Sequence, residues 1–192
     1  MKVLLIDNYD SFTYNLYHEI ANTDVAVKVI KNDDESLDEI LCKSFDAVVI
    51  SPGPKRPKDS GKLMALMPTL VKKPLLGICL GHQAIGEYYG ARLDYCEELV
   101  HGKAFAIQHQ NEGLFKGVPA HMKAVTYNSL RLAKKPWPDE LRQSAHLADG
   151  TIMAFSHFAK PIYGLQFHPE SIGTTFGALL LNNFLQKVKI KV

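Results

Sequence analysis

Short apolar runs without alternation, each followed by an amphipathic stretch, recur four times in the first half of the chain and constrain the fold more than any other feature. The pairs are 3–6 with 12–21, 25–30 with 36–43, 47–50 with 61–71, and 75–78 with 82–89. Strands that are apolar on both faces must be covered on both sides, as parallel strands joined by helices are. We therefore expect an α/β fold with an open, doubly wound, mostly parallel sheet flanked by helices.

The second half has a different pattern, in which strand-like segments are separated by Gly, Pro, Asn and Asp at hairpin-like spacing. The segments are KAFAIQH, HMKAVTYNSL, QSAHLAD, TIMAFSH and IYGLQFH, and an amphipathic stretch over 174–187 follows them. We expect additional strands here, several of them antiparallel, and a closing helix. Because no repeat or linker interrupts the chain, residues 1–192 are expected to form one domain.

Composition narrows the class of function. A net charge of +2 gives no electrostatic basis for binding nucleic acid or an anionic membrane. No stretch approaches the roughly 18 apolar residues that span a bilayer, and acidic residues come too early for a signal peptide, so we expect a cytoplasmic protein. Cys42, Cys79 and Cys96 form no C-x-x-C pair, and the histidines show no metal-ligand spacing, so no disulfide framework, metal or cofactor is expected.

Cys79 lies in the run Gly77-Ile78-Cys79-Leu80-Gly81, between an apolar strand and an amphipathic helix. This is the G-x-C-x-G form of a nucleophile elbow, a turn so sharp that side chains at the two glycine positions would collide. Free N–H groups at the helix start favour a thiolate, and the N–H of Leu80 faces the place where an oxyanion would form. A buried structural cysteine is the alternative, and we keep that interpretation for the other two cysteines.

His168 and Glu170 lie in the run QFHPES, directly after the apolar strand 162–165. A thiol nucleophile needs an imidazole that a third group holds in one tautomer. Pro169 disfavours a helix at His168, so we expect an extended segment in which the two side chains project to the same side. Glu170 could then accept one ring N–H and leave the other nitrogen for Cys79. A surface histidine beside a solvated glutamate is the alternative.

The run Ser-Pro-Gly-Pro at 51–54 follows the strand 47–50. Its prolines restrict the loop, and Gly53 allows a backbone N–H to approach a ligand. With the N–H of Leu80 it could form a two-donor oxyanion hole. Taken alone this run is only a tight loop, but it follows a parallel strand, at whose carboxyl end the sites of open α/β sheets lie.

With SPGP, GICLGHQ and QFHPES in this order, the chain resembles the class I (triad) glutamine amidotransferases over nearly its full length. The segments DNYDSFTYN at 7–15, HGK at 101–103 and YNSL at 127–130 are similar to the small subunits of anthranilate synthase and aminodeoxychorismate synthase. The resemblance implies a flavodoxin-like open sheet, with residues 1–192 as one glutamine amidotransferase type 1 domain.

Position by position, the resemblance implies that Cys79 is the nucleophile, His168 the general base and then acid, and Glu170 the residue that orients the imidazole. The oxyanion donors and glutamine-binding residues that it implies are Gly53, Leu80, Gln83 and the backbone of Ser129 and Leu130. Without the resemblance, Gln83 would be an ordinary residue of a first helical turn, and Ser129-Leu130 an ordinary strand end.

Two positions depart from the family pattern. Lys55 follows Pro54 where the family commonly has a glycine, which affects a glycine-dependent backbone contact to glutamine. Asn128 stands where the family often has histidine. Neither departure changes the three catalytic side chains.

The implied reaction is the hydrolysis of glutamine to glutamate and ammonia through a γ-glutamyl thioester. Nothing in the chain is left over to bind chorismate, so a large chorismate-binding partner is expected to receive the ammonia, with 8–12 and 55–58 as candidate contact segments. Two alternatives stay open, a free-standing γ-glutamyl peptidase and a non-catalytic flavodoxin-like binding module. The sequence also leaves open whether the partner makes anthranilate, aminodeoxychorismate or both.

Overall fold

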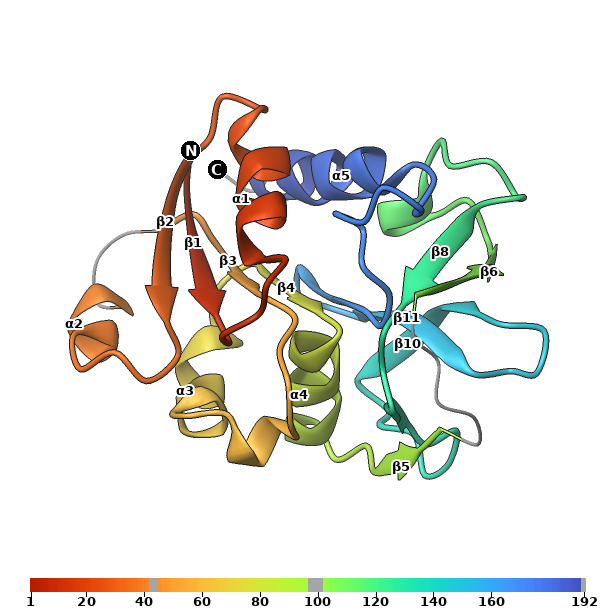
Figure 1. Ribbon diagram of the computed structural model, residues 1–192, viewed down its shortest axis with the longest axis horizontal. Helices are drawn as coiled ribbons and strands as arrows, with labels where there is room; N and C mark the ends of the chain where they lie inside the picture. Colours follow the sequence, from red (N-terminus) through yellow and green to blue (C-terminus); the bar gives the residue numbers. More distant parts are fainter. Residues whose placement is uncertain (42–44, 97–101, 191–192) are drawn as a thin grey trace.

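The computed structural model describes residues 1–41, 45–96 and 102–190, and its central element is an eight-stranded sheet in the order β2-β1-β3-β4-β12-β11-β10-β7 (Figure 1). The parallel strands are β1 (Lys2–Asp7), β2 (Ala26–Lys31), β3 (Ala47–Ile50), β4 (Leu75–Ile78) and β12 (Ile162–Leu165). The antiparallel strands are β11 (Ile152–His157), β10 (Leu141–His146) and β7 (Gln108–His109). The predicted open, mostly parallel α/β sheet is confirmed.

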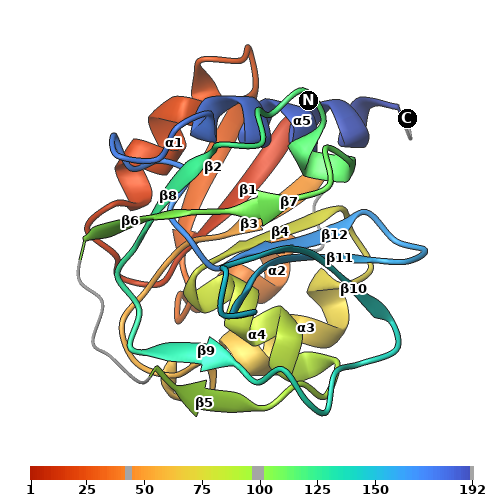
Figure 2. The same ribbon diagram turned by 90° about the vertical axis from the view of Figure 1, so that its right-hand side faces the viewer.

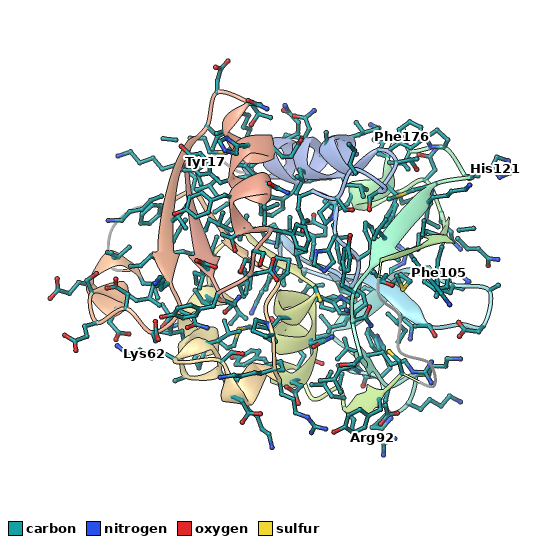
Figure 3. All side chains as sticks on the ribbon, viewed as in Figure 1. Tyr17, Lys62, Arg92, Phe105, His121 and Phe176 are labelled. Atoms are coloured by element: carbon teal, nitrogen blue, oxygen red, sulfur yellow. The ribbon has the colours of Figure 1, made fainter. Side chains whose placement is uncertain are left out.

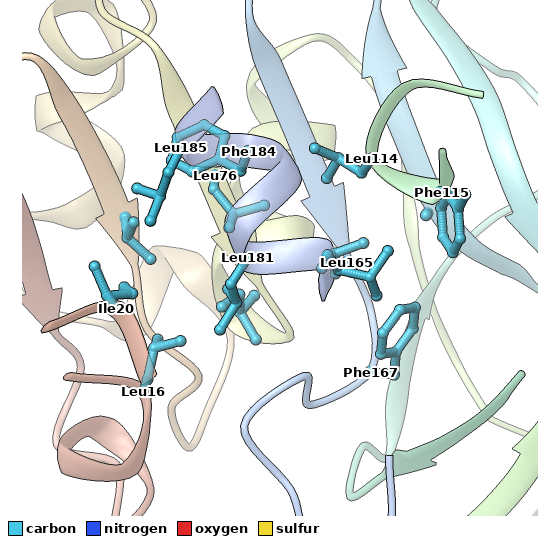
Figure 4. Packing of buried hydrophobic residues seen from close by; sticks show 14 of the residues in the cluster. Leu16, Ile20, Leu76, Leu114, Phe115, Leu165, Phe167, Leu181, Phe184 and Leu185 are labelled. Atoms are coloured by element: carbon cyan, nitrogen blue, oxygen red, sulfur yellow. The ribbon is translucent and has the colours of Figure 1, made fainter. Parts of the chain in front are cut away.

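Helices cover both faces of the sheet. One face carries α1 (Thr13–Ala21) and α5 (Gly177–Lys189), and the other carries α2 (Leu37–Leu41), α3 (Leu63–Leu70) and α4 (Leu80–Tyr88). Alternate residues of β1 pack into two hydrophobic layers, one on each face of the sheet. Val3 and Leu5 pack on the side of α1 and α5, and Leu4 and Ile6 pack on the opposite side. Figure 4 shows the first layer. Burial on both faces explains why the strand sequences do not alternate.

Two smaller antiparallel sheets flank the main one (Figure 2), which confirms the additional strands expected in the second half. They pair β5 (Leu93–Tyr95) with β9 (Leu130–Leu132) and β6 (Lys103–Ala106) with β8 (Lys123–Thr126), and short 3-10 turns occur at Pro57–Asp59 and Gly113–Phe115. The strand β5 was not predicted from the sequence. Cys42 and His101 lie outside the described residues.

The closing helix begins at Gly177, three residues later than expected. Side-chain hydrogen bonds hold the preceding segment in a loop, because Thr174 Oγ1 accepts from the N–H of Val125 at 3.0 Å and Thr175 Oγ1 accepts from the N–H of Lys123 at 2.9 Å. Threonine hydroxyls that bind backbone groups compete in this way with helix formation. The loop therefore remains tied to β8.

The strand β12 lies between β4 and β11, so it joins the parallel and antiparallel parts of the sheet. Leu165 is in register with Ile78, and the N–H of Cys79 donates to the carbonyl oxygen of Leu165 at 2.8 Å. The segments that leave β4 and β12 therefore start side by side. Within the described ranges, no helix has the length and apolar character needed to cross a membrane.

Replacing Phe184 by alanine is expected to lower the free energy of unfolding by roughly 3 to 5 kcal/mol. Its ring is 1% exposed and packs between α5 and the sheet. Urea unfolding followed by circular dichroism measures the loss. Gln186→Ala, at an exposed position of the same helix, is the matched control and should change the value by less than about 0.5 kcal/mol. Equal losses in the two variants would contradict this packing.

Candidate active site

The turn from β4 into α4 holds Cys79 in a strained conformation, with φ 50° and ψ −99°. A non-glycine residue with positive φ stores backbone strain that the surrounding structure must enforce. A Cβ on Gly77 would lie 2.4 Å from the carbonyl carbon of Gly81, and a Cβ on Gly81 would lie 2.7 Å from the oxygen of Ile50. The collision expected at both glycines of the elbow is therefore present.

The thiol of Cys79 is nearly enclosed, since the residue is 7% exposed. Cys79 is the N-cap residue of α4, and its carbonyl accepts the first helical hydrogen bond, from the N–H of Gln83 at 3.0 Å. Leu80 is the first helical residue, so its N–H has no acceptor within the helix. This helix end therefore carries a partial positive charge next to the sulfur.

His168 and Glu170 form a buried pair in which ring Nδ1 lies 2.7 Å from carboxylate Oε1. The expected extended backbone is wrong here, because Pro169 and Glu170 form a turn in which the N–H of Ser171 donates to the carbonyl of His168 at 3.2 Å. Proline favours the second position of such turns. The turn, rather than strand alternation, brings the carboxylate back onto the ring.

Backbone bonds and neighbouring rings fix the position of His168. Its N–H donates to the carbonyl of Val125 at 3.0 Å, and its carbonyl accepts from the hydroxyl of Thr174 at 2.7 Å. The rings of Phe12 and Tyr127 lie edge-on to the imidazole, with centroids 5.9 and 5.0 Å away, and stack on each other at 5.4 Å. The antiparallel half of the structure and the β1–α1 loop thus jointly fix the position of the imidazole.

The electrostatic surroundings keep His168 charged. Burial disfavours the imidazolium, but the neighbouring Cys79 and Glu170 side chains outweigh it and raise the pKa of His168 to about 10. Nε2 of His168 has no partner in hydrogen-bonding geometry among the described residues. The structure therefore brings together a sulfur, an imidazole and a carboxylate, with Nε2 free to exchange a proton.

The loop after β3 passes directly over the start of α4. A Cβ on Gly53 would lie 2.6 Å from Cβ of Asn8 and 2.8 Å from Cδ2 of Leu80, so only glycine fits. The buried Asn8 holds this loop, because its N–H donates to Ser51 Oγ and its side-chain amide to the Ser51 carbonyl, both at 2.9 Å. Asn32 donates to Asn8 Oδ1 at 2.9 Å and completes the network. The two expected oxyanion donors, Gly53 and Leu80, are thus adjacent.

The two departures from the family pattern have visible structural consequences. Lys55 has φ 70°, the left-handed region that favours glycine, so it takes the sign of φ that a glycine would supply. Asn128 donates from Nδ2 to the carbonyl of Leu130 at 2.8 Å, and the same atom lies 3.5 Å from the sulfur of Cys96. Asn128 therefore braces the segment in which Ser129 and Leu130 lie.

The expected glutamine-binding residues also lie together. Gln83 Nε2 donates to the carbonyl of Leu130 at 2.9 Å, and the carbonyl of Ser129 accepts from the N–H of Cys96 at 2.9 Å. Gln166 was not predicted from the sequence as a site residue, yet its Nε2 lies 3.8 Å from the sulfur of Cys79. A polar residue at the end of an apolar strand was the sequence signal that could have indicated Gln166.

Among the described residues, no group of three or more His, Cys, Asp or Glu side chains is arranged to hold a metal ion.

Comparison with known proteins identifies the family. The family model described as "Glutamine amidotransferase class-I" matches residues 4–188. Anthranilate synthase component 2 of Mycobacterium tuberculosis is 41% identical over 189 residues, which cover 96% of this chain and 82% of that protein. The same component of Methanothermobacter marburgensis is 42% identical over 194 residues, with 96% and 97% covered. Aminodeoxychorismate synthase of Streptomyces griseus is 45% identical over 188 residues, which cover 96% of this chain and 26% of that protein.

The fold is also similar to that of a solved structure. A crystal structure of a Thermoplasma acidophilum protein, assigned as part of a GMP synthase, superposes with a TM-score of 0.88 and covers 100% of this chain and 95% of its own. The two sequences are 23% identical, so this likeness supports the fold alone.

The raised pKa of His168 makes stability depend on pH. Its contribution is fully present below the ordinary histidine pKa of about 6.5 and is lost as the pH rises towards about 10. Glu170→Gln removes one of the two side chains that raise this pKa. The difference in free energy of unfolding between wild type and Glu170→Gln should therefore shrink over this range.

Urea titrations at several pH values between these limits measure that difference. His121→Gln is the control, because His121 is exposed at the edge of the molecule (Figure 3), and it should change the free energy of unfolding by less than about 0.5 kcal/mol. A difference for Glu170→Gln that does not change with pH would contradict the assignment.

Proposed function

The chain belongs to the class-I glutamine amidotransferase family, and we propose that Cys79, His168 and Glu170 hydrolyse glutamine to glutamate and ammonia. The observation that carries this proposal is the convergence of two distant segments, the elbow at Cys79 and the buried pair of His168 and Glu170. These are the parts that a nucleophile, its acid-base partner and an orienting carboxylate require.

In the first half of the proposed reaction, the Cys79 thiolate attacks the side-chain amide carbon of glutamine and forms a carbon–sulfur bond. The negative charge moves to the amide oxygen. As the carbon–nitrogen bond breaks, the His168 imidazolium gives its proton to the departing nitrogen, which leaves as ammonia. In the second half, His168 takes a proton from water, the oxygen attacks the thioester, and the carbon–sulfur bond breaks to release glutamate and restore the thiolate.

The proposed oxyanion hole consists of the N–H groups of Gly53 and Leu80. Two features support it, the absence of an intrahelical acceptor for Leu80 and the close packing of the Gly53 loop on the Leu80 side chain. The network of Asn8, Ser51 and Asn32 keeps that loop in place before substrate arrives. Donors that are fixed in advance lower the barrier because they need no reorganisation during the reaction.

We assign the recognition of the α-amino and α-carboxylate groups of glutamine to Gln83 and the backbone of Ser129 and Leu130. Their adjacency supports the assignment, since Gln83 already bonds to the Leu130 carbonyl across the gap between α4 and β9. The first turn of α4 thus carries both the reacting sulfur and a binding amide, which sets the distance between the two ends of the substrate.

The proposed recipient of the ammonia is a large chorismate-binding subunit. The names of the relatives support this, because they are components of anthranilate synthase or are aminodeoxychorismate synthase. Tyr9 is a candidate contact, since it is 52% exposed at the carboxyl edge of the sheet. The loop at 55–58 follows β3 at the same edge.

We propose a cytosolic location, because a nucleophilic thiol needs a reducing compartment.

Replacing Cys79 by serine or alanine should abolish glutamine-dependent amination of chorismate in the complex with its large partner, with a loss of several orders of magnitude. Activity with added ammonium salts should survive, because that route bypasses the thioester. Ammonia release and the aminated product are measured, and product identity distinguishes anthranilate from aminodeoxychorismate. Cys96→Ser is the matched control and should retain activity. Glutamine turnover in the Cys79 variants would reject the mechanism, and fast wild-type turnover without a partner would favour a free-standing hydrolase.

Replacing Gly53 by alanine should reduce glutamine-dependent kcat by about 100-fold. The added methyl group would force the loop away from Asn8 and Leu80 and withdraw one oxyanion donor. Steady-state kinetics with glutamine, compared with ammonium-dependent activity of the same complex, separates this loss from a general loss of structure. An unchanged kcat would remove Gly53 from the proposed oxyanion hole.

A further inference from the structure

A chain of side-chain amide hydrogen bonds runs from β9 through α4 to the sulfur of Cys79. Gln83 Nε2 donates to the carbonyl of Leu130 at 2.9 Å and to Gln166 Oε1 at 3.2 Å. Gln166 Nε2 then lies 3.8 Å from Cys79 Sγ, within hydrogen-bonding distance for sulfur. Gln83 is 3% exposed and Gln166 is fully buried, so the chain is shielded from water.

The direction of this chain follows from its first member. A backbone carbonyl can only accept hydrogen bonds, so Gln83 must turn its NH₂ group towards Leu130. The same nitrogen donates to Gln166, which must therefore present its oxygen to Gln83 and its NH₂ group to Cys79. An amide NH₂ group has no acceptor capacity, so the sulfur has to be the acceptor. A thiolate accepts a hydrogen bond more strongly than a thiol does.

We propose that Gln166 is a positioning residue that donates a hydrogen bond to the Cys79 sulfur and stabilises its thiolate. The inference deepens the proposed function, on which it rests for the catalytic use of that thiolate. The segment after β12 then supplies two groups to the sulfur, an amide donor from Gln166 and an imidazole from His168. Hydrogen bonds in a buried chain polarise one another, which strengthens the last bond.

Backbone hydrogen bonds fix the positions of Cys79 and Gln166 relative to each other. The N–H of Cys79 donates to the carbonyl of Leu165 at 2.8 Å, and the N–H of Gln166 donates to the carbonyl of Met153 at 2.9 Å. Cys79 and Gln166 are therefore the first residues beyond the paired ends of β4 and β12. The pairing of these strands therefore fixes the backbone positions from which both side chains project.

Gln166→Met distinguishes a donor from a residue that merely fills space, and Gln166→Glu shows that the measurement responds to a charge at this position. Gln166→Met keeps a similar volume and removes the donor, whereas Gln166→Glu keeps the shape and replaces the donor by a carboxylate. A pure packing role predicts that Gln166→Met leaves the thiol pKa unchanged, while the carboxylate of Gln166→Glu raises it whatever the role of Gln166. A donor role predicts that the thiol pKa rises from wild type to Gln166→Met and rises further in Gln166→Glu, where a negative charge faces the sulfur.

The experiment measures the rate at which iodoacetamide alkylates Cys79 between about pH 5 and 10, with peptide mapping to separate this cysteine from the other two. For Gln166→Met we expect the thiol pKa to rise by about one unit, so that alkylation below both pKa values slows about tenfold. Absorbance of the thiolate at about 240 nm, corrected with Cys79→Ser, gives a second measure. Gln143→Met, at an exposed position of β10, is the matched control and should leave the pKa unchanged.

An unchanged thiol pKa in Gln166→Met would overturn the inference. Should either variant fail to fold, Gln83→Met breaks the chain one step earlier and should raise the pKa by a smaller amount, and no rise there would also overturn it. The measurement needs neither glutamine nor a partner. A wild-type protein without glutaminase activity would reject the proposed function alone, while an active protein with unchanged thiol pKa values would reject this inference alone.

Discussion

The backbone contact between Gly77 and Gly81 is the constraint on which the rest of the site depends. The chain reverses so tightly at Cys79 that a carbon atom added at either glycine would overlap the backbone opposite, and the cysteine accepts a strained φ as a result. Packing on both faces of the sheet keeps β4 and α4 from relaxing this strain. The thiol is thus held at the carboxyl end of β4 and the amino end of α4 at once, where helix N–H groups face it.

The second half of the site is built on a different principle. The imidazole of His168 does not lie on a strand, and its position is set by hydrogen bonds to Val125 and Thr174 and by the rings of Phe12 and Tyr127. A buried carboxylate compensates the cost of burying its charge. The parallel half of the sheet therefore fixes the sulfur, and the antiparallel half with its loops fixes the proton carrier, while the pairing of β4 with β12 aligns the two.

Local patterns predicted most of the fold, because apolar runs and glycine spacing report on nearby structure. The strands at 47–50 and 75–78 begin and end where expected, and the elbow was readable from two glycines. The turn at Pro169 was not predicted, since an extended segment and a turn both satisfy the residue before proline. The roles of Asn8 and Gln166 were also missed, because their partners, Ser51 and Cys79, are distant in sequence and meet only through the sheet.

The position of β12 has a consequence for how the molecule forms. It is the last strand along the described residues, yet it pairs with β4 on one side and β11 on the other, near the middle of the sheet. During synthesis the parallel and antiparallel halves of the sheet cannot pair with each other until β12 has been made, as far as residue 165. Such non-local pairing makes folding slow. The sulfur consequently gains its proton carrier only after synthesis has passed His168, and a chain that stops before this residue carries a thiol without a working site.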